Sequence, residues 1–250
     1  LNAQIQKNEG LYPLILFSHG LGGMRMQNTV QMEELASRGY VVVAMDHPYD
    51  ANVTIYSDGT TAEFRSALRE DATEKQFWEV RLPQIKTRAE DLSFILDQID
   101  NKKENDNQLW ETVDLSRIGV FGHSFGGATC VVSSFNDRRI DACINLDGWM
   151  EPIESKIIRQ GLNIPFLYIG QEKWIDTPLN DIKLDSLILS SNGRKELLLG
   201  TKHFDYSDTP QLSPISSKLG IAGKVDMHIL REQINSEILS FFDLYVKATR

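Results

Sequence analysis

The chain has 250 residues, of which 41% are hydrophobic and 24% charged, so it can build a sizeable core and is not expected to be disordered. Its length fits one large α/β domain or two small ones. The formal net charge of -9 argues against non-specific binding to nucleic acid and weakens the case for electrostatic docking to an anionic membrane, since both need clustered Lys and Arg.

The predicted elements alternate between strands and helices along the whole chain. In chain order they are a strand at 14–17, a helix at 30–37, a strand at 41–45, a helix at 77–100, a strand at 117–121, a helix at 128–134, strands at 140–146, 164–169 and 196–199, and a helix at 227–246. The strands are short apolar runs, typical of positions buried on both faces of a sheet. This alternation predicts a mostly parallel central sheet flanked by helices on both faces. We expect residues 1–250 to form a single domain.

The segments between these elements are polar and rich in turn residues. Residues 46–76 are interpreted as a surface excursion with a turn at Asp58-Gly59. Pro83 is expected to break the helix around it or to mark an early turn. The turn-rich segment 206–224 fits either a mobile flap over a site or a passive surface loop.

The cysteines and the start of the chain give three further expectations. Cys130 and Cys143 lie in apolar runs and are expected to be buried free thiols. The chain has no apolar stretch of about 18 residues that would predict a membrane span, and no signal-peptide pattern. Because it begins at Leu1 rather than Met, we expect it to lack some N-terminal residues of the full protein.

The pentapeptide Gly-His-Ser-Phe-Gly at 122–126 matches the pattern G-x-S-x-G. It directly follows the predicted strand at 117–121 and precedes a predicted helix, which is the setting of a nucleophile elbow in the α/β-hydrolase fold. The glycines leave room for backbones to approach, and the turn presents the serine hydroxyl beside the positive end of a helix. We therefore predict an α/β-hydrolase fold with Ser124 as the nucleophile.

A serine hydroxyl is a weak nucleophile until a base takes its proton. In this fold the acid and the histidine follow the serine in the chain, and only His203 and His228 come after Ser124. His203 follows the last predicted strand, in a loop that should open on the same edge of the sheet as Ser124. His228 begins the terminal helix, where a surface or capping role is expected. The sequence therefore predicts His203 as the base.

Two positions fit the acid that orients this base. Asp147 follows the strand after the nucleophile helix, whereas Glu172 and Asp176 follow the next strand. Asp147 ends an apolar strand, so its carboxylate should be half buried, where it can fix the tautomer of an imidazole. The run after Gly170 is more polar. The residues alone favour Asp147 and leave Glu172 open.

An oxyanion hole needs two backbone N–H groups that point at the developing negative charge. Phe125, the residue after the nucleophile, is expected to supply one. The loop after the first strand reads Ser-His-Gly-Leu-Gly-Gly over 18–23, and its glycines let the chain wrap close to Ser124, so Leu21 is the expected second donor. His19 is interpreted as a residue at the substrate pocket that hydrogen-bonds the loop backbone and shapes the hole.

Aromatic residues and one acidic segment have alternative interpretations. Trp149 and Trp174 fit the wall of an apolar acyl pocket, although Trp174 equally fits the core. The Asp and His residues within 46–50 are interpreted as a solvated loop rather than a metal site. Because no His/Cys cluster has the spacing of a zinc site, we expect no metal.

Four segments share motifs with a known family. They are Ser-His-Gly-Leu-Gly at 18–22, Ala-Ser-Arg-Gly-Tyr-Val-Val at 36–42 followed by Asp-His at 46–47, Gly-His-Ser-Phe-Gly-Gly-Ala-Thr at 122–129, and Leu-Asp-Gly-Trp-Met at 146–150. In these segments the chain resembles the platelet-activating-factor acetylhydrolases of the plasma and intracellular type II group. The likeness runs in order from about residue 11 to residue 205.

The resemblance implies an activity and a set of site residues. It places the acid on the Leu-Asp-x-Trp motif, at Asp147, the base at His203, and the oxyanion donors at Leu21 and Phe125. Members of the family hydrolyse short or oxidised acyl chains from phospholipids, without calcium or another cofactor.

The chain departs from the family's pattern at Pro48, where a basic residue is common, and at Glu151, where Trp-Met is commonly followed by Phe. We therefore expect a serine hydrolase whose substrate is a small-molecule ester or a phospholipid. A thioesterase or a peptidase could use the same triad. A non-catalytic interaction module could use the same fold, but such modules usually lose the serine or the histidine, and both are present here.

Overall fold

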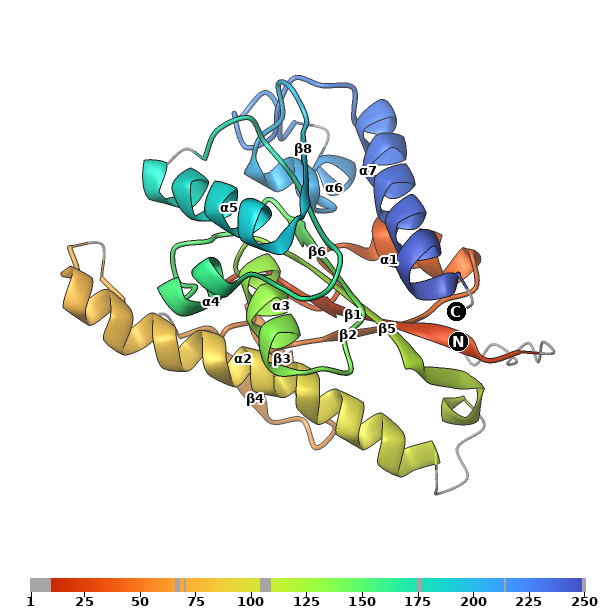
Figure 1. Ribbon diagram of the computed structural model, residues 1–250. Helices are drawn as coiled ribbons and strands as arrows, with labels where there is room; N and C mark the ends of the chain where they lie inside the picture. The colour runs from red at the N-terminus through yellow and green to blue at the C-terminus, as the bar shows by residue number, and fades with distance from the viewer. Residues whose placement is uncertain are drawn as a thin grey trace.

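A six-stranded parallel sheet forms the centre of the computed structural model (Figure 1), which describes residues 10–65, 68–69, 71–103, 109–174, 177–213 and 215–248. The strand order is β2-β1-β5-β6-β7-β8, and every neighbouring pair is parallel. The strands are β1 (Tyr12–Ser18), β2 (Val41–Met45), β5 (Val113–His123), β6 (Ala142–Leu146), β7 (Phe166–Gly170) and β8 (Arg194–Leu197).

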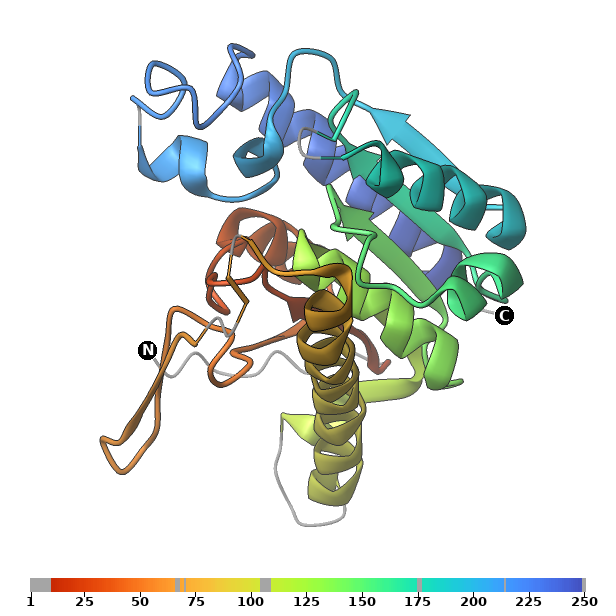
Figure 2. The same ribbon diagram turned by 90° about the vertical axis from the view of Figure 1, so that its left-hand side faces the viewer.

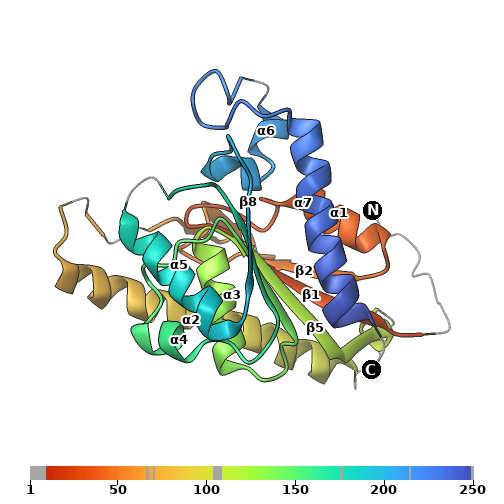
Figure 3. The same cartoon turned by 45° about the horizontal axis from the view of Figure 1, so that its top comes forward.

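Helices cover both faces of this sheet (Figure 3). One face carries α1 (Thr29–Ser37) and α7 (Met227–Phe242), and the other carries α2 (Glu74–Lys103), α3 (Phe125–Asn136), α4 (Ser155–Gln160) and α5 (Pro178–Ser191). Alternate side chains of β1 point to opposite faces, as expected for a strand. Leu16 packs with the core under α2 to α5, whereas Phe17 packs with the core under α1 and α7. The predicted mostly parallel sheet with helices on both faces is confirmed.

Five of the six strands differ from their predicted bounds by one to four residues, and only β2 has the predicted ones. In β5 and β8 the cause is that polar residues begin the strand. β5 begins at Val113 rather than at 117, since Val113 and Asp114 also pair with β1. The polar residues Asp114 and Ser116 hide this start from the apolar pattern, and a bulge lies between Asp114 and Ile118. β8 begins with Arg194, two residues before the predicted run. It is one of the two edge strands of the sheet, and charged side chains are common on edge strands, so the apolar pattern there is weak.

Some strands and helices lie in segments for which no regular element was predicted. The excursion at 46–76 contains a two-stranded antiparallel hairpin, β3 (Val53–Ile55) and β4 (Thr61–Glu63), which projects away from the helices (Figure 2). Helix α5 begins at a recognisable signal: Thr177 caps it by accepting the N–H of Leu179 over 3.0 Å, and Pro178 occupies the first turn.

Pro83 neither breaks α2 nor marks its start, so that prediction is wrong. The helix runs from Glu74 to Lys103 with Pro83 inside it. A proline has no N–H, so the carbonyl of Glu79, one turn earlier, has no helical donor. Both residues are exposed, and water can hydrate that carbonyl. Packing of the buried side of α2, which includes Leu92, stabilises the helix despite this defect.

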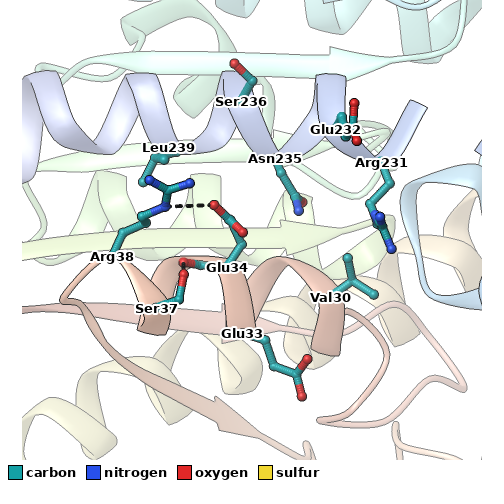
Figure 4. A pocket seen from close by; sticks show the side chains of 10 residues that line it. All are labelled: Val30, Glu33, Glu34, Ser37, Arg38, Arg231, Glu232, Asn235, Ser236 and Leu239. Carbon is teal, nitrogen blue, oxygen red and sulfur yellow. Dashed lines mark hydrogen bonds and ion pairs between the residues drawn. The ribbon is translucent and has the colours of Figure 1, made fainter. Parts of the chain in front are cut away.

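The surface between α1 and α7 is hollowed over a volume of about 670 Å³ (Figure 4). Its lining is mostly polar and includes an ion pair of Glu34 with Arg38 at 2.9 Å. It shares no lining residue with the cavity at Ser124 described below. Among the described residues, no helix is both long enough and apolar enough to span a bilayer.

We predict that Pro83→Ala stabilises the protein by about 1–2 kcal/mol, because it restores the hydrogen bond to Glu79. The gain is smaller than the ~3 kcal/mol that an interior proline costs a helix, since proline also restricts the unfolded chain. Urea unfolding measures it. The matched control is Thr87→Ala, an exposed site one turn further along α2. A Pro83 variant no more stable than this control would contradict the prediction.

Candidate active site

The turn that carries Ser124 can form only because glycines flank it. Ser124 joins β5 to α3 with φ 57° and ψ -122°, and its N–H donates to the carbonyl of Leu146 over 3.0 Å. A Cβ on Gly126 would overlap the carbonyl oxygen of Ser18, and a Cβ on Gly122 would overlap that of Gly126. The serine turn (residues 122–126) therefore packs backbone against backbone on the loop that follows β1.

The topology of the sheet brings these two loops together. β1 lies between β2 and β5. The chain therefore passes from β1 to β2 on one side and later enters β5 on the other side of β1. The loops at the carboxyl ends of β1 and β5 diverge at this point, which is where open α/β sheets bind ligands. The glycine loop (residues 18–23) and the serine turn meet there.

Asp147 and His203 are in direct contact, with Nδ1 of His203 2.6 Å from Oδ2 of Asp147. Asp147 is completely buried, and its carboxylate accepts three further hydrogen bonds: from Tyr168 Oη at 3.0 Å, and from the backbone N–H and Nε2 of Gln171 at 3.0 and 2.8 Å. Each carboxylate oxygen thus has two donors. Because Nδ1 of His203 donates to the carboxylate, Nε2 is left as the nitrogen that can accept a proton.

Ser124 and His203 line the same cavity, which has a volume of about 380 Å³. Its other walls are Leu21, Trp149, Glu151, Gln171, Trp174 and Thr177. The ring of Trp174 meets that of His203 edge to face, with centroids 5.0 Å apart. Of the two interpretations of Trp174, the cavity wall is the one that its position supports.

The other candidates for acid and base lie elsewhere. Glu172 is exposed, and its Oε2 lies 3.4 Å from the N–H of Gly200. Asp176 lies outside the described residues. His228 is exposed at the start of α7, where Asp226 caps the helix by accepting its N–H.

Of the two expected oxyanion donors, Phe125 belongs to the serine turn and Leu21 to the glycine loop. Leu21 lines the cavity, and Phe125 is the first residue of α3, where N–H groups have no acceptor within the helix. His19, within the glycine loop, is completely buried and does not line the cavity, so its predicted position at the substrate pocket is wrong. Its Nδ1 donates to the carbonyl of Gly20 over 2.6 Å and its Nε2 accepts the N–H of His47 over 3.1 Å. Burial, with Arg88 and His47 nearby, lowers the pKa of His19 to about 2.

The interpretation of 46–50 as a solvated loop is wrong, because His47 is only 1% exposed. Its Nε2 lies 2.9 Å from Ser18 Oγ and its Nδ1 lies 2.7 Å from Asp91 Oδ2. Arg88, also buried, donates to Ser18 Oγ over 3.2 Å and to the carbonyl of His19. Arg88 was not among the predicted site residues. Its signal in the sequence is a charged residue on the apolar side of the helix, between Ile85 and Leu92.

Comparisons with known proteins agree on one family. Residues 1–248 match the model of platelet-activating factor acetylhydrolase, isoform II. The chain is 30% identical over 267 residues to a platelet-activating factor acetylhydrolase of Bos taurus. The alignment covers 98% of this chain and 59% of the bovine protein. It is 29% identical over 269 residues to a platelet-activating factor acetylhydrolase of Gallus gallus. That alignment covers 96% of this chain and 63% of the Gallus gallus protein. The chain spans about three fifths of the length of these relatives.

A solved structure gives the fold. The ferulic acid esterase of Streptomyces cinnamoneus matches with a TM-score of 0.76 and 28% sequence identity, over 97% of this chain and 69% of that chain. Together with the six-stranded parallel sheet and the helices on both its faces, this match shows the α/β-hydrolase fold that the sequence predicted.

We predict that Gly126→Ala lowers the free energy of unfolding by more than about 4 kcal/mol, because its Cβ would meet backbone that cannot move aside. Thermal and urea unfolding measure this loss. Gly10→Ala is the matched control, since a Cβ there meets nothing within 4 Å, and it should change stability by less than about 0.5 kcal/mol. Equal stability of the two variants would refute the close approach of residues 18 and 126.

Proposed function

Because the chain belongs to the platelet-activating factor acetylhydrolase isoform II family, we propose that it is a serine hydrolase that cleaves a carboxylic ester with a short or small acyl group. In this proposal Ser124 is the nucleophile, His203 the base and Asp147 the acid that orients the base. One observation carries it: Nδ1 of His203 lies 2.6 Å from the buried carboxylate of Asp147, beside a cavity that Ser124 and His203 both line.

The acylation step uses the free nitrogen of His203. Nε2 takes the hydroxyl proton of Ser124 as Oγ attacks the acyl carbon, and the carbonyl oxygen gains the negative charge. The backbone N–H groups of Leu21 and Phe125 donate to this oxygen and stabilise the charge. The C–O bond to the alcohol then breaks, His203 returns the proton to the departing oxygen, and the acyl group stays on Ser124.

The deacylation step repeats this chemistry with water. His203 takes a proton from a water molecule, whose oxygen attacks the acyl carbon, and the proton then passes to Ser124 Oγ as the carboxylic acid leaves. Asp147 stabilises the imidazolium in both steps. Because its four hydrogen bonds hold it rigidly, it keeps the ring of His203 in one orientation. The mechanism uses no metal and no cofactor.

The cavity supports a small acyl group. Its volume of about 380 Å³ is at the low end for ligand sites, and Leu21, Trp149 and Trp174 give it apolar walls. Glu151 adds a carboxylate to the lining. We propose either a small ester or a phospholipid with a short acyl chain as the substrate, the latter because relatives are named platelet-activating factor acetylhydrolases.

We predict that Ser124→Ala lowers kcat/KM by roughly 10⁴-fold or more and leaves the melting temperature nearly unchanged; His203→Ala should do the same, since the triad acts as a unit. The assay is hydrolysis of p-nitrophenyl esters with acyl chains from two to twelve carbons, and the wild type should be fastest on the short chains. More than a few per cent of activity in either variant would overturn the triad. A folded wild type that hydrolyses none of the esters would favour another substrate or a non-catalytic module.

We predict that Asp147→Asn lowers kcat by roughly 10³- to 10⁴-fold, because an amide can donate to Nδ1 and so favours the wrong tautomer of His203. Glu172→Gln, the matched change at the other candidate acid, should alter kcat by less than about twofold, since Glu172 is exposed and bonds only weakly to Gly200. Steady-state kinetics on the best ester compare the two. The opposite ranking would assign the acid to Glu172.

A further inference from the structure

Three hydrogen bonds in series join the glycine loop to the backbone of His203. The N–H of Gly20 donates to Oε1 of Gln27 over 2.7 Å. Nε2 of Gln27 lies 3.0 Å from Nδ1 of His123, and Nε2 of His123 lies 2.9 Å from the carbonyl oxygen of His203. The series therefore crosses from the glycine loop, through the serine turn, to the loop that carries His203.

The two ends of this series fix the direction of every bond in it. A carbonyl oxygen can only accept, so Nε2 of His123 carries a hydrogen and donates to His203. A backbone N–H can only donate, so the amide oxygen of Gln27 faces Gly20 and its NH₂ group faces His123. Nδ1 of His123 accepts that bond and has no hydrogen, and the ring is a neutral imidazole in a single tautomer.

Burial keeps the ring of His123 in that neutral form. The side chain is 1% exposed, and burial, followed by the proximity of the His203 ring, lowers its pKa to about 3. The hydrogen bond to the carbonyl of His203 and, to a smaller extent, the charge of Asp147 act in the opposite direction. The rings of His123 and His203 have centroids 4.5 Å apart. A charge on His123 would oppose the imidazolium that forms on His203 in the proposed reaction.

The backbones on either side of this series are also tied together. The carbonyl of Gln27 accepts the N–H of Asp208 over 2.9 Å, and Nδ2 of Asn28 donates to the carbonyl of Tyr206 over 2.8 Å. The carboxylate of Asp208 accepts the N–H of Thr29 over 2.7 Å. The segment that follows the glycine loop and the segment that follows His203 are thus one hydrogen-bonded unit.

We propose that Gln27 and His123 are positioning residues for ester hydrolysis: they hold the glycine loop and His203 at a fixed separation, and Gln27 keeps His123 in its uncharged tautomer. Neither is proposed to touch the substrate. The inference rests on the proposed function, because it concerns the geometry in which His203 accepts a proton and Leu21 donates to the oxyanion.

Two variants of Gln27 separate positioning from packing. Gln27→Met keeps the length of the side chain and removes both hydrogen bonds, so we expect kcat to fall about tenfold, as for the loss of one or two hydrogen bonds, with KM unchanged within about twofold. Gln27→Glu keeps the acceptor for Gly20 but replaces the donor to His123 by a carboxylate, which attracts a second proton to that ring. We expect Gln27→Glu to lower kcat further than Gln27→Met, by roughly 100-fold in all.

The pH profile gives a readout that packing alone would not move. In Gln27→Glu, His123 takes up a proton as the pH falls, so the acid limb of log kcat against pH should gain a second ionisation. In the wild type and in Gln27→Met it should follow one. Gln27→Glu equal to or more active than Gln27→Met, with an unchanged acid limb, would overturn the proposal.

Gln31→Met is the matched control, because Gln31 is buried and also makes two side-chain hydrogen bonds, to Asn28 at 3.0 Å and Asn235 at 3.3 Å. It should lower the melting temperature as Gln27→Met does and leave kcat within about twofold of wild type. An equal loss of kcat in Gln31→Met would show that lost stability, rather than positioning, explains the effect.

Nitrogen-15 NMR of the histidine rings tests the tautomer without any activity. Between pH 5 and 8, His123 should stay neutral with its hydrogen on Nε2 in the wild type and gain a second proton in Gln27→Glu. A wild-type His123 that titrates in this range would overturn the inference. Failure of the wild type to hydrolyse any ester would overturn the proposed function instead, and the NMR result would still decide the state of His123.

Discussion

The rest of the site depends on the close approach of two backbones, at Ser18 and Gly126. No side chain larger than hydrogen fits at residue 126, because a Cβ would overlap the carbonyl of Ser18. This approach brings the glycine loop, which carries Leu21, against the start of α3, where Phe125 follows Ser124. The sheet makes it possible, since β1 and β5 are neighbours and pair in register from Ser18 with Gly122 back to Leu14 with Ile118. The proposed oxyanion hole needs no side chain, because both of its donors are backbone N–H groups.

Buried polar side chains hold these loops in place, and their hydrogen bonds leave little choice of proton position. His19 donates from Nδ1 to Gly20, whereas His123 donates from Nε2 to His203. Arg88 is fully buried, which lowers its pKa to about 10, with Asp50 acting in the opposite direction, so it remains charged at neutral pH under the glycine loop. An unpaired polar group in such a place would cost several kcal/mol. Breaking any of these bonds would leave a buried polar group unpaired, so each bond resists movement of the loops.

The parts of this arrangement that the sequence predicted are local in the chain. The strands and the serine turn come from apolar runs and glycines within a few residues of one another, and the order of Ser124, Asp147 and His203 follows from the fold. The role inferred for Gln27 has no local signal, because its partner His123 is 96 positions away. Helix α5 did have a local signal at Thr177, which the apolar pattern alone overlooked. Pro83 shows the opposite case, in which packing of α2 overrides a local rule.

In the loop after β6, the backbone and the side chains have different roles. Its backbone holds the proposed triad, since the N–H of Trp149 donates to the carbonyl of Ser124 over 3.0 Å and that of Asp147 to Ile169 over 2.8 Å. Its side chains at Trp149 and Glu151 line the cavity. Because the hydrogen bond from this loop to Ser124 uses main-chain atoms, the side chains at 149 and 151 can differ without breaking it. Glu151, where the resemblance gives Phe, is a change of this kind: it alters the cavity wall and none of these main-chain hydrogen bonds.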